Sequence, residues 1–374
     1  MIVTRVGWLA LSIAVFVGSY ELQAQDAEFV YISNVTGVGE DSGDIEVQTT
    51  RALENLGEAL QEHGLGYEHV VVSNVFLKDT RHFQMMNQIY RGFFSTDPPT
   101  RATVQADLLD PDALFQISVV AARGEKQIIS PASLQSPELP YSWGIKVGKT
   151  LFISGATSRN PETYQPVSGD VSTQTDRVFG NVGLILEEAG MDYGDLVVCK
   201  VFLEDGRIFG GMNSAYREFV PADDPPARAT VRSRLMNPVF NTEIQCIAEE
   251  SSERSVVIGE GRSRSRSPFS PGISTGNRLY LSGMVGSGEG GVPSDVQGQT
   301  RNTLANLEAT LAAADMDFTN VVDTWVYVTD IRQWAQVEEV LAEVLPEGSP
   351  TPTIIGAPLM GATLLVEIQM TAER

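Results

Sequence analysis

The sequence has little positive charge. Its 374 residues carry 26 Lys and Arg against 48 Asp and Glu, which gives a formal net charge of −22. Such a surface repels phosphate backbones and anionic lipid headgroups over most of its area. We therefore expect no nucleic acid as a partner, and no membrane as a partner of the mature chain.

Residues that bind metals or form cross-links are also scarce. The chain has three histidines, all in its first third, and two cysteines, Cys199 and Cys246. These residues lack the spacing of a zinc or iron site, so we predict no metal. The two cysteines could pair in an exported protein, but their spacing does not show that they meet. We expect two buried free thiols, since unpaired cysteine usually packs as a small hydrophobic residue.

Long apolar runs are missing after the N-terminus. The first residues, "MIVTRVGWLALSIAVFVGSYELQAQ", place Arg5 before an apolar run from Trp8 to Val17, and small and polar residues follow up to Ala24. This order is typical of a secretory signal, and the run is short for a bilayer span. We predict a signal peptide over residues 1–24 and an exported protein, periplasmic or secreted. The alternative is an uncleaved anchor.

The sequence is rich in internal repetition, which is the feature that organises it. A Gln-Thr pair followed by Asn recurs three times, and the copies are 126 and 125 residues apart: Gln48-Thr49 with Asn55, Gln174-Thr175 with Asn181, and Gln299-Thr300 with Asn306. The segments "FLKD", "FLED" and "YVTD" recur at the same offsets. The chain therefore contains three copies of one module.

Each copy has the same coarse order of elements. Short β-branched or aromatic runs ("VYISN", "LFISG", "LYLSG") read as strands and are followed by an amphipathic helix, a second strand, a second helix and a closing pair of strands. Helices gathered on one side of a sheet predict an α+β layer fold. We place the modules at residues 25–125, 138–250 and 269–374.

Two stretches between the modules are expected to be flexible linkers. The first is rich in proline and serine, and the second, residues 251–268, contains the Arg/Ser tract "RSRSRS". An Arg/Ser tract can also bind RNA or be phosphorylated. We favour the linker, because isolated charge runs are usually solvated.

The last strand of each module alternates between two faces. One face is mostly apolar, as in Phe115, Ile117 and Val119, and can pack beneath the helices. The opposite face is polar, as in Glu243 and Gln245 of the second copy. A polar face can simply be exposed to water. Three tandem modules favour a covered, partly polar interface instead.

The module resembles the Rid/YjgF family of reactive intermediate deaminases over nearly all of residues 26–374. The second copy matches best, from "LPYSWGIKVGKTLFISG" through "MNSAYREF" to "PPARATVRSRLMNPVFNTEIQC". The resemblance implies a chorismate-mutase-like fold that normally forms a homotrimer with ligand clefts between subunits. Three modules in one chain would then form an intramolecular pseudo-trimer, and we expect a monomer.

Carried over residue by residue, the family's site is most complete in the second copy. Arg228 matches the arginine that binds the substrate carboxylate, and Glu243 matches the acid that handles the attacking water. The substrate-binding positions match Tyr141, Ser154, Gly155 and Asn213. An arginine can hold a carboxylate through two parallel hydrogen bonds, and a glutamate can take a proton from water. The simpler alternatives are an interface ion pair for Arg228, packing for Tyr141 and a helix cap for Asn213.

The other two copies depart from the pattern. The first keeps Arg101 and Asn87 but has Gln116 in place of the acid, so we expect ligand binding with little turnover there. The third keeps Glu367, but "PTPTIIGAPL" has no arginine, and Glu338 replaces the asparagine. That copy looks structural. We expect one competent cleft, with Arg228 and Glu243 in it.

The resemblance implies hydrolysis of 2-imino or enamine acids to 2-oxo acids and ammonia, without a cofactor, because the imine is already electrophilic. The substrate would be a small carboxylate. The alternative is an exported protein that binds a small carboxylate or a protein partner without chemistry. RNA cleavage is also attached to the family, but the charge of −22 argues against it.

Overall fold

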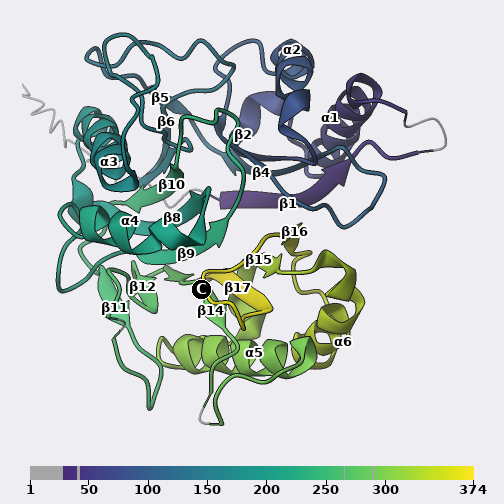
Figure 1. Ribbon diagram of the computed structural model, residues 1–374, viewed down its shortest axis with the longest axis vertical. Helices are drawn as coiled ribbons and strands as arrows, with labels where there is room; N and C mark the ends of the chain where they lie inside the picture. The colour runs from purple at the N-terminus through teal and green to yellow at the C-terminus, as the bar shows by residue number, and fades with distance from the viewer. Residues whose placement is uncertain (1–27, 40–42, 265, 289) are drawn as a thin grey trace, which may run out of the picture.

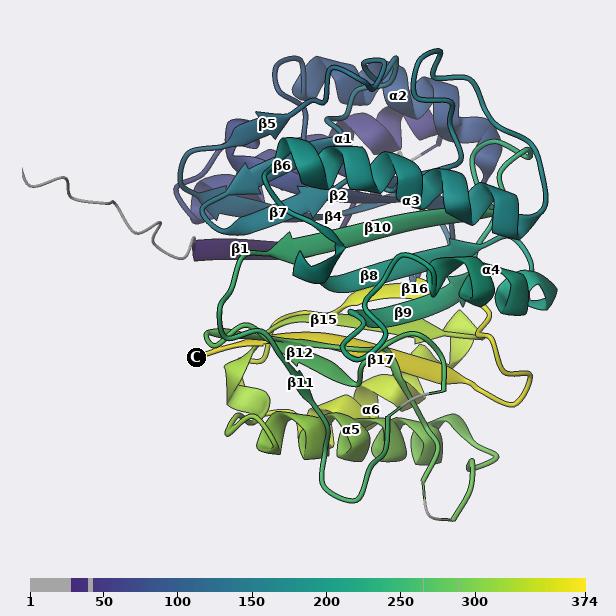
Figure 2. The ribbon, with the colours of Figure 1, turned by 90° about the vertical axis from the view of Figure 1, so that its left-hand side faces the viewer.

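The computed structural model describes residues 28–39, 43–264, 266–288 and 290–374, which fold into three similar modules (Figure 1). The expected signal peptide lies outside these residues. In each module two α-helices cover the outer face of a β-sheet, and Figure 2 shows α3 (Val171–Glu188) and α5 (Val296–Ala312) on opposite sides of the molecule with the sheets between them. Among the described helices, none combines the length and apolar character that a bilayer span requires.

The first module has a four-stranded sheet in the order β1-β4-β2-β3. β2 and β3 are parallel, and the other neighbours are antiparallel. In chain order its elements are β1 (Glu28–Thr36), α1 (Ile45–Glu62), β2 (Val70–Leu77), α2 (Phe83–Phe93), β3 (Thr100–Gln105) and β4 (Phe115–Arg123).

The second module repeats this arrangement and extends it, with the order β5-β6-β7-β10-β8-β9. Its parallel pair is β8 and β9. In addition to α3, its elements are β5 (Gln127–Ile129), β6 (Gly144–Val147), β7 (Thr150–Ile153), β8 (Leu196–Leu203), α4 (Phe209–Tyr216), β9 (Ala227–Arg232) and β10 (Thr242–Glu249).

The third module has the order β11-β12-β13-β17-β15-β16, and β14 pairs with β17 off this path. In addition to α5, its elements are β11 (Ser255–Val257), β12 (Gly272–Ser274), β13 (Arg278–Leu281), β14 (Met284–Val285), β15 (Val321–Val328), α6 (Trp334–Val344), β16 (Thr353–Gly356) and β17 (Val366–Glu373).

The two stretches expected to be flexible linkers are partly ordered as strands. β5 follows the first module directly and pairs with β6, and β11 lies within residues 251–268 and pairs with β12. The sequence of β5 is "QII" and that of β11 is "SVV", and the β-branched residues in both favour a strand. The linker interpretation is therefore wrong for residues 127–129 and 255–257.

The repeated polar residues have structural roles. In each copy the repeated glutamine is buried in the first helix and bonds the backbone just before the last strand; in the second copy Gln174 Nε2 donates to Val239 O (2.8 Å) and its Oε1 accepts from Asn241 N (2.7 Å). The repeated asparagine donates to a backbone carbonyl in the segment that leads into the first helix, as Asn181 does to Arg159 O (2.9 Å). A buried backbone group needs such a partner, which explains why these residues recur.

The two faces of each last strand are buried in different surroundings. The apolar face packs on the helices of its own module, as Phe115 and Ile117 do in the first module. The polar face is also buried, and Gln116, Glu243 and Glu367 bond residues of a neighbouring module. The predicted α+β fold of three tandem modules with a covered polar interface is confirmed.

The modules contact one another in a ring. Gln105 N donates to Arg234 O of the second module (2.9 Å), and Arg232 N donates to Pro358 O of the third (2.8 Å). Asp107 N donates to Gly356 O (3.1 Å), which joins the first module to the third. An apolar cluster with members from all three sheets, including Phe76, Phe202 and Trp325, lies inside this ring.

The cysteines are paired, which corrects the expectation of free thiols. Cys199 on β8 and Cys246 on β10 stand directly opposite each other in an antiparallel ladder, with Cα atoms 4.1 Å apart, and form a disulfide. Opposed residues on one face of an antiparallel pair bring their side chains together, but the register of the two strands was not available from spacing alone.

We expect that removing this disulfide destabilises the second module. The bond closes 47 residues of chain, and a loop of this size typically contributes about 2–4 kcal/mol to the free energy of unfolding. The test is denaturant unfolding of wild type and the Cys199→Ala/Cys246→Ala variant, with and without reductant. Reductant should lower the stability of wild type only. Detection of two titratable thiols in unreduced, unfolded wild type would contradict the pairing.

Candidate active site

Arg101 is the centre of a cleft between the first and second modules. It lies on the edge strand β3, where its N–H donates to Ser154 Oγ (2.9 Å) and its carbonyl accepts from Gly155 N (3.0 Å). Its side chain is buried, and Nη2 donates to Asn87 Oδ1 (2.8 Å). Nη1 is buried without a partner in the described chain. A buried donor of this kind is costly unless a ligand satisfies it.

Glu243 faces the same cleft from β10 of the second module. Its Oε1 accepts from Thr103 N of the first module (3.1 Å), two residues beyond Arg101. Burial raises the pKa of Glu243 to about 8, against the smaller opposing effects of the Thr103 hydrogen bond and Arg101. A Cβ at Gly155 would collide with the carboxylate, which explains the glycine at this position.

Arg101 and Glu243 both line a cavity of about 240 Å³. Tyr141 is also in its wall, and its ring lies 5.8 Å from the Arg101 guanidinium carbon. Of the residues expected at the site, Arg101, Asn87, Tyr141, Ser154, Gly155 and Glu243 are therefore together in or directly around this cavity. They come from two modules.

Two further residues of the wall, Arg159 and Tyr164, were missed in the sequence. They lie in the loop between β7 and α3, and the Arg159 guanidinium stacks 4.2 Å from the Tyr164 ring centroid and 5.0 Å from that of Phe240. The Tyr164 and Tyr141 hydroxyls are 2.7 Å apart. Tyr164 has φ +61°, a left-handed conformation that is unfavourable for a bulky residue. No sequence pattern signals this geometry.

A second cleft, between the second and third modules, repeats the Arg–Glu pair. Arg228 N donates to Ser282 Oγ (2.7 Å) and Arg228 Nη2 to Asn213 Oδ1 (2.7 Å). Glu367 accepts from Thr230 N (3.4 Å), and burial raises its pKa to about 8. Phe269 lies over the guanidinium at 5.2 Å, so this cleft has no hydroxyl where the first has Tyr141.

The third cleft, between the third and first modules, lacks both functional groups. Pro352 stands in the place of the arginine and Gln116 in the place of the acid. Asn34 occupies the position of Gly155, and its Oδ1 accepts from Ile354 N (2.9 Å) and from Gln116 Nε2 (3.1 Å). Ile354 N corresponds to the Thr103 and Thr230 amides that bond the glutamates. The Asn34 amide therefore takes the place of a carboxylate.

These clefts correct the expectation that Arg228 and Glu243 share one crevice. Arg228 is beside Glu367, and Glu243 is beside Arg101. The arginine of a module lies on its parallel edge strand and faces the next module, whereas the acid lies on the central last strand and faces the previous one. The first copy has lost the acid and the third copy has lost the arginine, and both changes therefore fall in the cleft between these two modules. The other two clefts keep an arginine and a glutamate.

Comparison with known proteins identifies the family. A family model described as "Endoribonuclease L-PSP" matches residues 15–123, 133–250 and 261–374. The chain belongs to this family, the Rid/YjgF family. A RutC family protein of Pyrococcus abyssi is 40% identical over 124 residues, which are 33% of this chain and 96% of that protein. Each Rid relative thus corresponds to about one module.

Two relatives have names that state an activity. Chloroplastic Reactive Intermediate Deaminase A of Arabidopsis thaliana is 35% identical and matches 35% of this chain and 70% of its own. The human 2-iminobutanoate/2-iminopropanoate deaminase is 31% identical, over 33% of this chain and 89% of its own. A chorismatase crystal structure covers 92% of this chain and 98% of its own, with a TM-score of 0.55 and 15% identity. This last similarity concerns the fold alone.

We expect the two buried glutamates to make stability fall as pH rises. Their folded pKa of about 8 lies above the 4.5 that is usual for a glutamate in water, so the folded state keeps protons that the unfolded chain has lost. Between these values each group should lower the free energy of unfolding by up to about 1.4 kcal/mol per pH unit.

The measurement is denaturant unfolding of wild type and of the Glu243→Gln/Glu367→Gln variant between pH 5 and 8. The variant cannot lose these protons, and its stability should fall less steeply. Parallel pH dependences for the two proteins would show that the glutamates are not held protonated.

Proposed function

We propose that the protein is a hydrolytic deaminase of 2-imino and enamine acids, which it converts to 2-oxo acids and ammonia in the cleft between the first and second modules. One observation carries the proposal. The unpartnered Nη1 of buried Arg101 and the carboxyl of Glu243, with its pKa of about 8, belong to the same cavity of about 240 Å³. The deaminase names of the relatives support the reaction class.

Arg101 would hold the substrate carboxylate. Its Nη2 is fixed by Asn87, and its Nη1 is free to donate to a carboxylate oxygen. Charge-assisted hydrogen bonds of a guanidinium are strong and directional, so the carboxylate would fix the position of the neighbouring C=N carbon. The main chain of Arg101 is also held in place, because its N–H donates to Ser154 Oγ and its carbonyl accepts from Gly155 N.

Glu243 would transfer the protons. A carboxyl with a pKa of about 8 is largely protonated at neutral pH, and it can protonate the imine nitrogen. The resulting carboxylate then takes a proton from the water that adds to C2, which gives a carbinolamine and restores the acid. The acid next protonates the amine, the C–N bond breaks, ammonia leaves, and the hydroxyl proton returns to Glu243 as the C=O bond forms. All protons are balanced without an added reactant.

Binding without turnover is the other function this cleft could have. An arginine with a free donor binds a carboxylate whether or not an acid is present. RNA is a poorer candidate for a substrate, because the formal charge of −22 opposes phosphate contacts. Turnover therefore has to be measured separately from binding.

We expect Glu243→Gln to lower kcat by about 10²–10⁴-fold, because the amide cannot exchange protons with water and substrate. Arg101→Lys should mainly raise KM, by about 10–100-fold, since lysine lacks the planar guanidinium that can bond Asn87 and the substrate carboxylate at the same time. The assay is ammonia or 2-oxo acid release from imino acids generated in situ, with thermal melting to verify that each variant is folded.

The matched variant is Glu367→Gln, which makes the same change in the second cleft. It measures how much of the activity arises beside Arg228. If Glu367→Gln abolishes turnover while Glu243→Gln leaves it intact, the assignment to the first cleft is wrong. If wild type binds 2-oxo acids but releases no ammonia, the protein is a binding module.

Arg159 gives this cleft a second cation and suggests a substrate class. Its guanidinium lines the same cavity as Arg101, stacked between Tyr164 and Phe240, and its Nη1 donates to Tyr164 O (3.0 Å). With Glu243 protonated, two fixed guanidinium groups face the cavity. An imino acid with a second carboxylate would satisfy both.

We expect wild type to have a higher kcat/KM for the imines of aspartate or glutamate than for that of alanine. Arg159→Met should raise KM for the dicarboxylic imines about tenfold, because one charged contact is lost, and change KM for the monocarboxylic imine less than twofold. Equal effects on both substrates would mean that Arg159 does not select the second carboxylate.

A further inference from the structure

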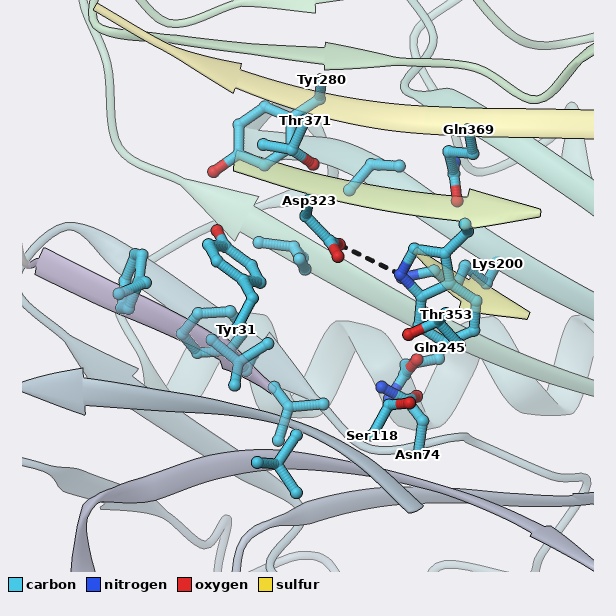
Figure 3. Close-up of a pocket in the computed structure, with 18 of the residues that line it drawn as sticks. Tyr31, Asn74, Ser118, Lys200, Gln245, Tyr280, Asp323, Thr353, Gln369 and Thr371 are labelled. Atoms are coloured by element: carbon cyan, nitrogen blue, oxygen red, sulfur yellow. Dashed lines mark hydrogen bonds between the residues drawn. The ribbon is translucent and has the colours of Figure 1, made fainter. Parts of the chain in front are cut away.

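A second cavity lies inside the ring, where the three sheets face one another. It has a volume of about 50 Å³ and is lined by residues of all three modules (Figure 3). It is separate from the cavity of Arg101 and Glu243, since the residues that line the two spaces are different. Its polar side chains come mainly from the central strands of the three sheets, and Figure 3 shows Lys200, Gln245 and Gln369 around it.

The walls of this axial cavity are not three-fold symmetric. Asn74, Lys200 and Trp325 hold equivalent positions, because they pair across the sheet with Ser118, Gln245 and Gln369, respectively. In an assembly of three identical modules a lysine here would bring three ammonium groups together near the axis, with strong repulsion. The single chain allows one lysine, one asparagine and one tryptophan.

Lys200 makes no direct ion pair among the described residues, although the charge of Asp323 acts on it and opposes the lowering of its pKa. Its Nζ lies 4.0 Å from the Trp325 ring centroid, and no hydrogen bond or ion pair joins it to another residue in the described parts of the chain. Asp323 also lines the cavity, but it accepts from Trp325 Nε1 (3.0 Å). Burial raises the pKa of Asp323 and lowers that of Lys200 to about 8, so the ammonium is still charged at neutral pH.

Amide groups beside Lys200 are also unsatisfied. Gln245 Nε2, Asn74 Oδ1 and both polar atoms of Gln369 are buried without a partner among the residues that the structure describes. These side chains are only 4–6% exposed. Buried polar atoms nearly always have a protein or water partner, and each exception needs an explanation. Here the Lys200 ammonium and two unpartnered amide NH₂ groups face one small space that also contains two unpartnered amide oxygens.

We propose that the axial cavity binds one small monovalent anion, held by the Lys200 ammonium and the side-chain amides of Gln245 and Gln369. The size of the cavity limits the ligand. Each water-sized group needs roughly 10–15 Å³ of such volume, so a space of about 50 Å³ holds about three to five heavy atoms. Chloride, formate and acetate fit this limit, and carboxylates with clearly more heavy atoms, such as gluconate, do not. The anion would give Lys200 a counter-charge in direct contact, in addition to the more distant Asp323.

The test is thermal unfolding in sodium chloride, formate, acetate or gluconate at equal ionic strength and pH 7. We expect the small anions to raise the Tm of wild type above its value in gluconate, which is too large for the cavity. Lys200→Met keeps the length of the side chain but removes the charge, and it should abolish the difference. The matched control is Lys146→Met on β6, whose partner is Glu250 and which should respond as wild type does.

A second measurement does not depend on the variant folding. Crystals of wild type grown in sodium bromide should show an anomalous scattering peak in the axial cavity, beside Lys200 Nζ, and formate should replace it in crystals grown without halide. Response to halide but not to carboxylate would restrict the ligand to inorganic anions. An axial cavity filled by water alone in bromide, or a Tm that follows ionic strength regardless of the anion, would overturn the proposal.

Discussion

The structure depends on one contact that occurs where modules meet. The main chain of the edge strand of one module bonds the Ser-Gly that follows the early strand of the next: Arg101 N donates to Ser154 Oγ, and Gly155 N donates to Arg101 O. This contact holds the arginine of one module beside the glutamate of the next module. Because the bonds involve main-chain atoms, the cleft geometry is set by the fold and is repeated at Arg228, Ser282 and Gly283.

Much of this fold could be predicted from the sequence, because repetition and periodicity are local signals. The offsets of 126 and 125 residues identified three modules, and the alternation in the last strands identified a polar face to be covered. The partner of each arginine could not be predicted, since it depends on which neighbour a strand edge faces. The disulfide was missed for a related reason. Cys199 lies opposite Cys246 because of the register of two strands, and this register is set when the sheet forms and is not contained in the spacing of the cysteines.

The third cleft shows how a site is lost without loss of the fold. Asn34 adopts a positive φ of 56°, a conformation that asparagine tolerates better than most residues. Its side-chain oxygen accepts from Ile354 N, whose counterparts in the other two clefts donate to a glutamate. Two copies depart from the family pattern, yet both departures affect this interface. Since each cleft takes one group from each of two modules, the remaining two clefts keep their arginine and acid.

The covalent connection of the modules also has a consequence for concentration. Clefts between separate subunits exist only while the subunits are associated, so their number falls on dilution as mass action favours dissociation. Modules on one chain meet at an effective concentration that is set by the connecting segments and not by the amount of protein. Residues 124–140 and 251–268, with the strands β5 and β11 in them, therefore keep the interfaces assembled even where the protein is very dilute.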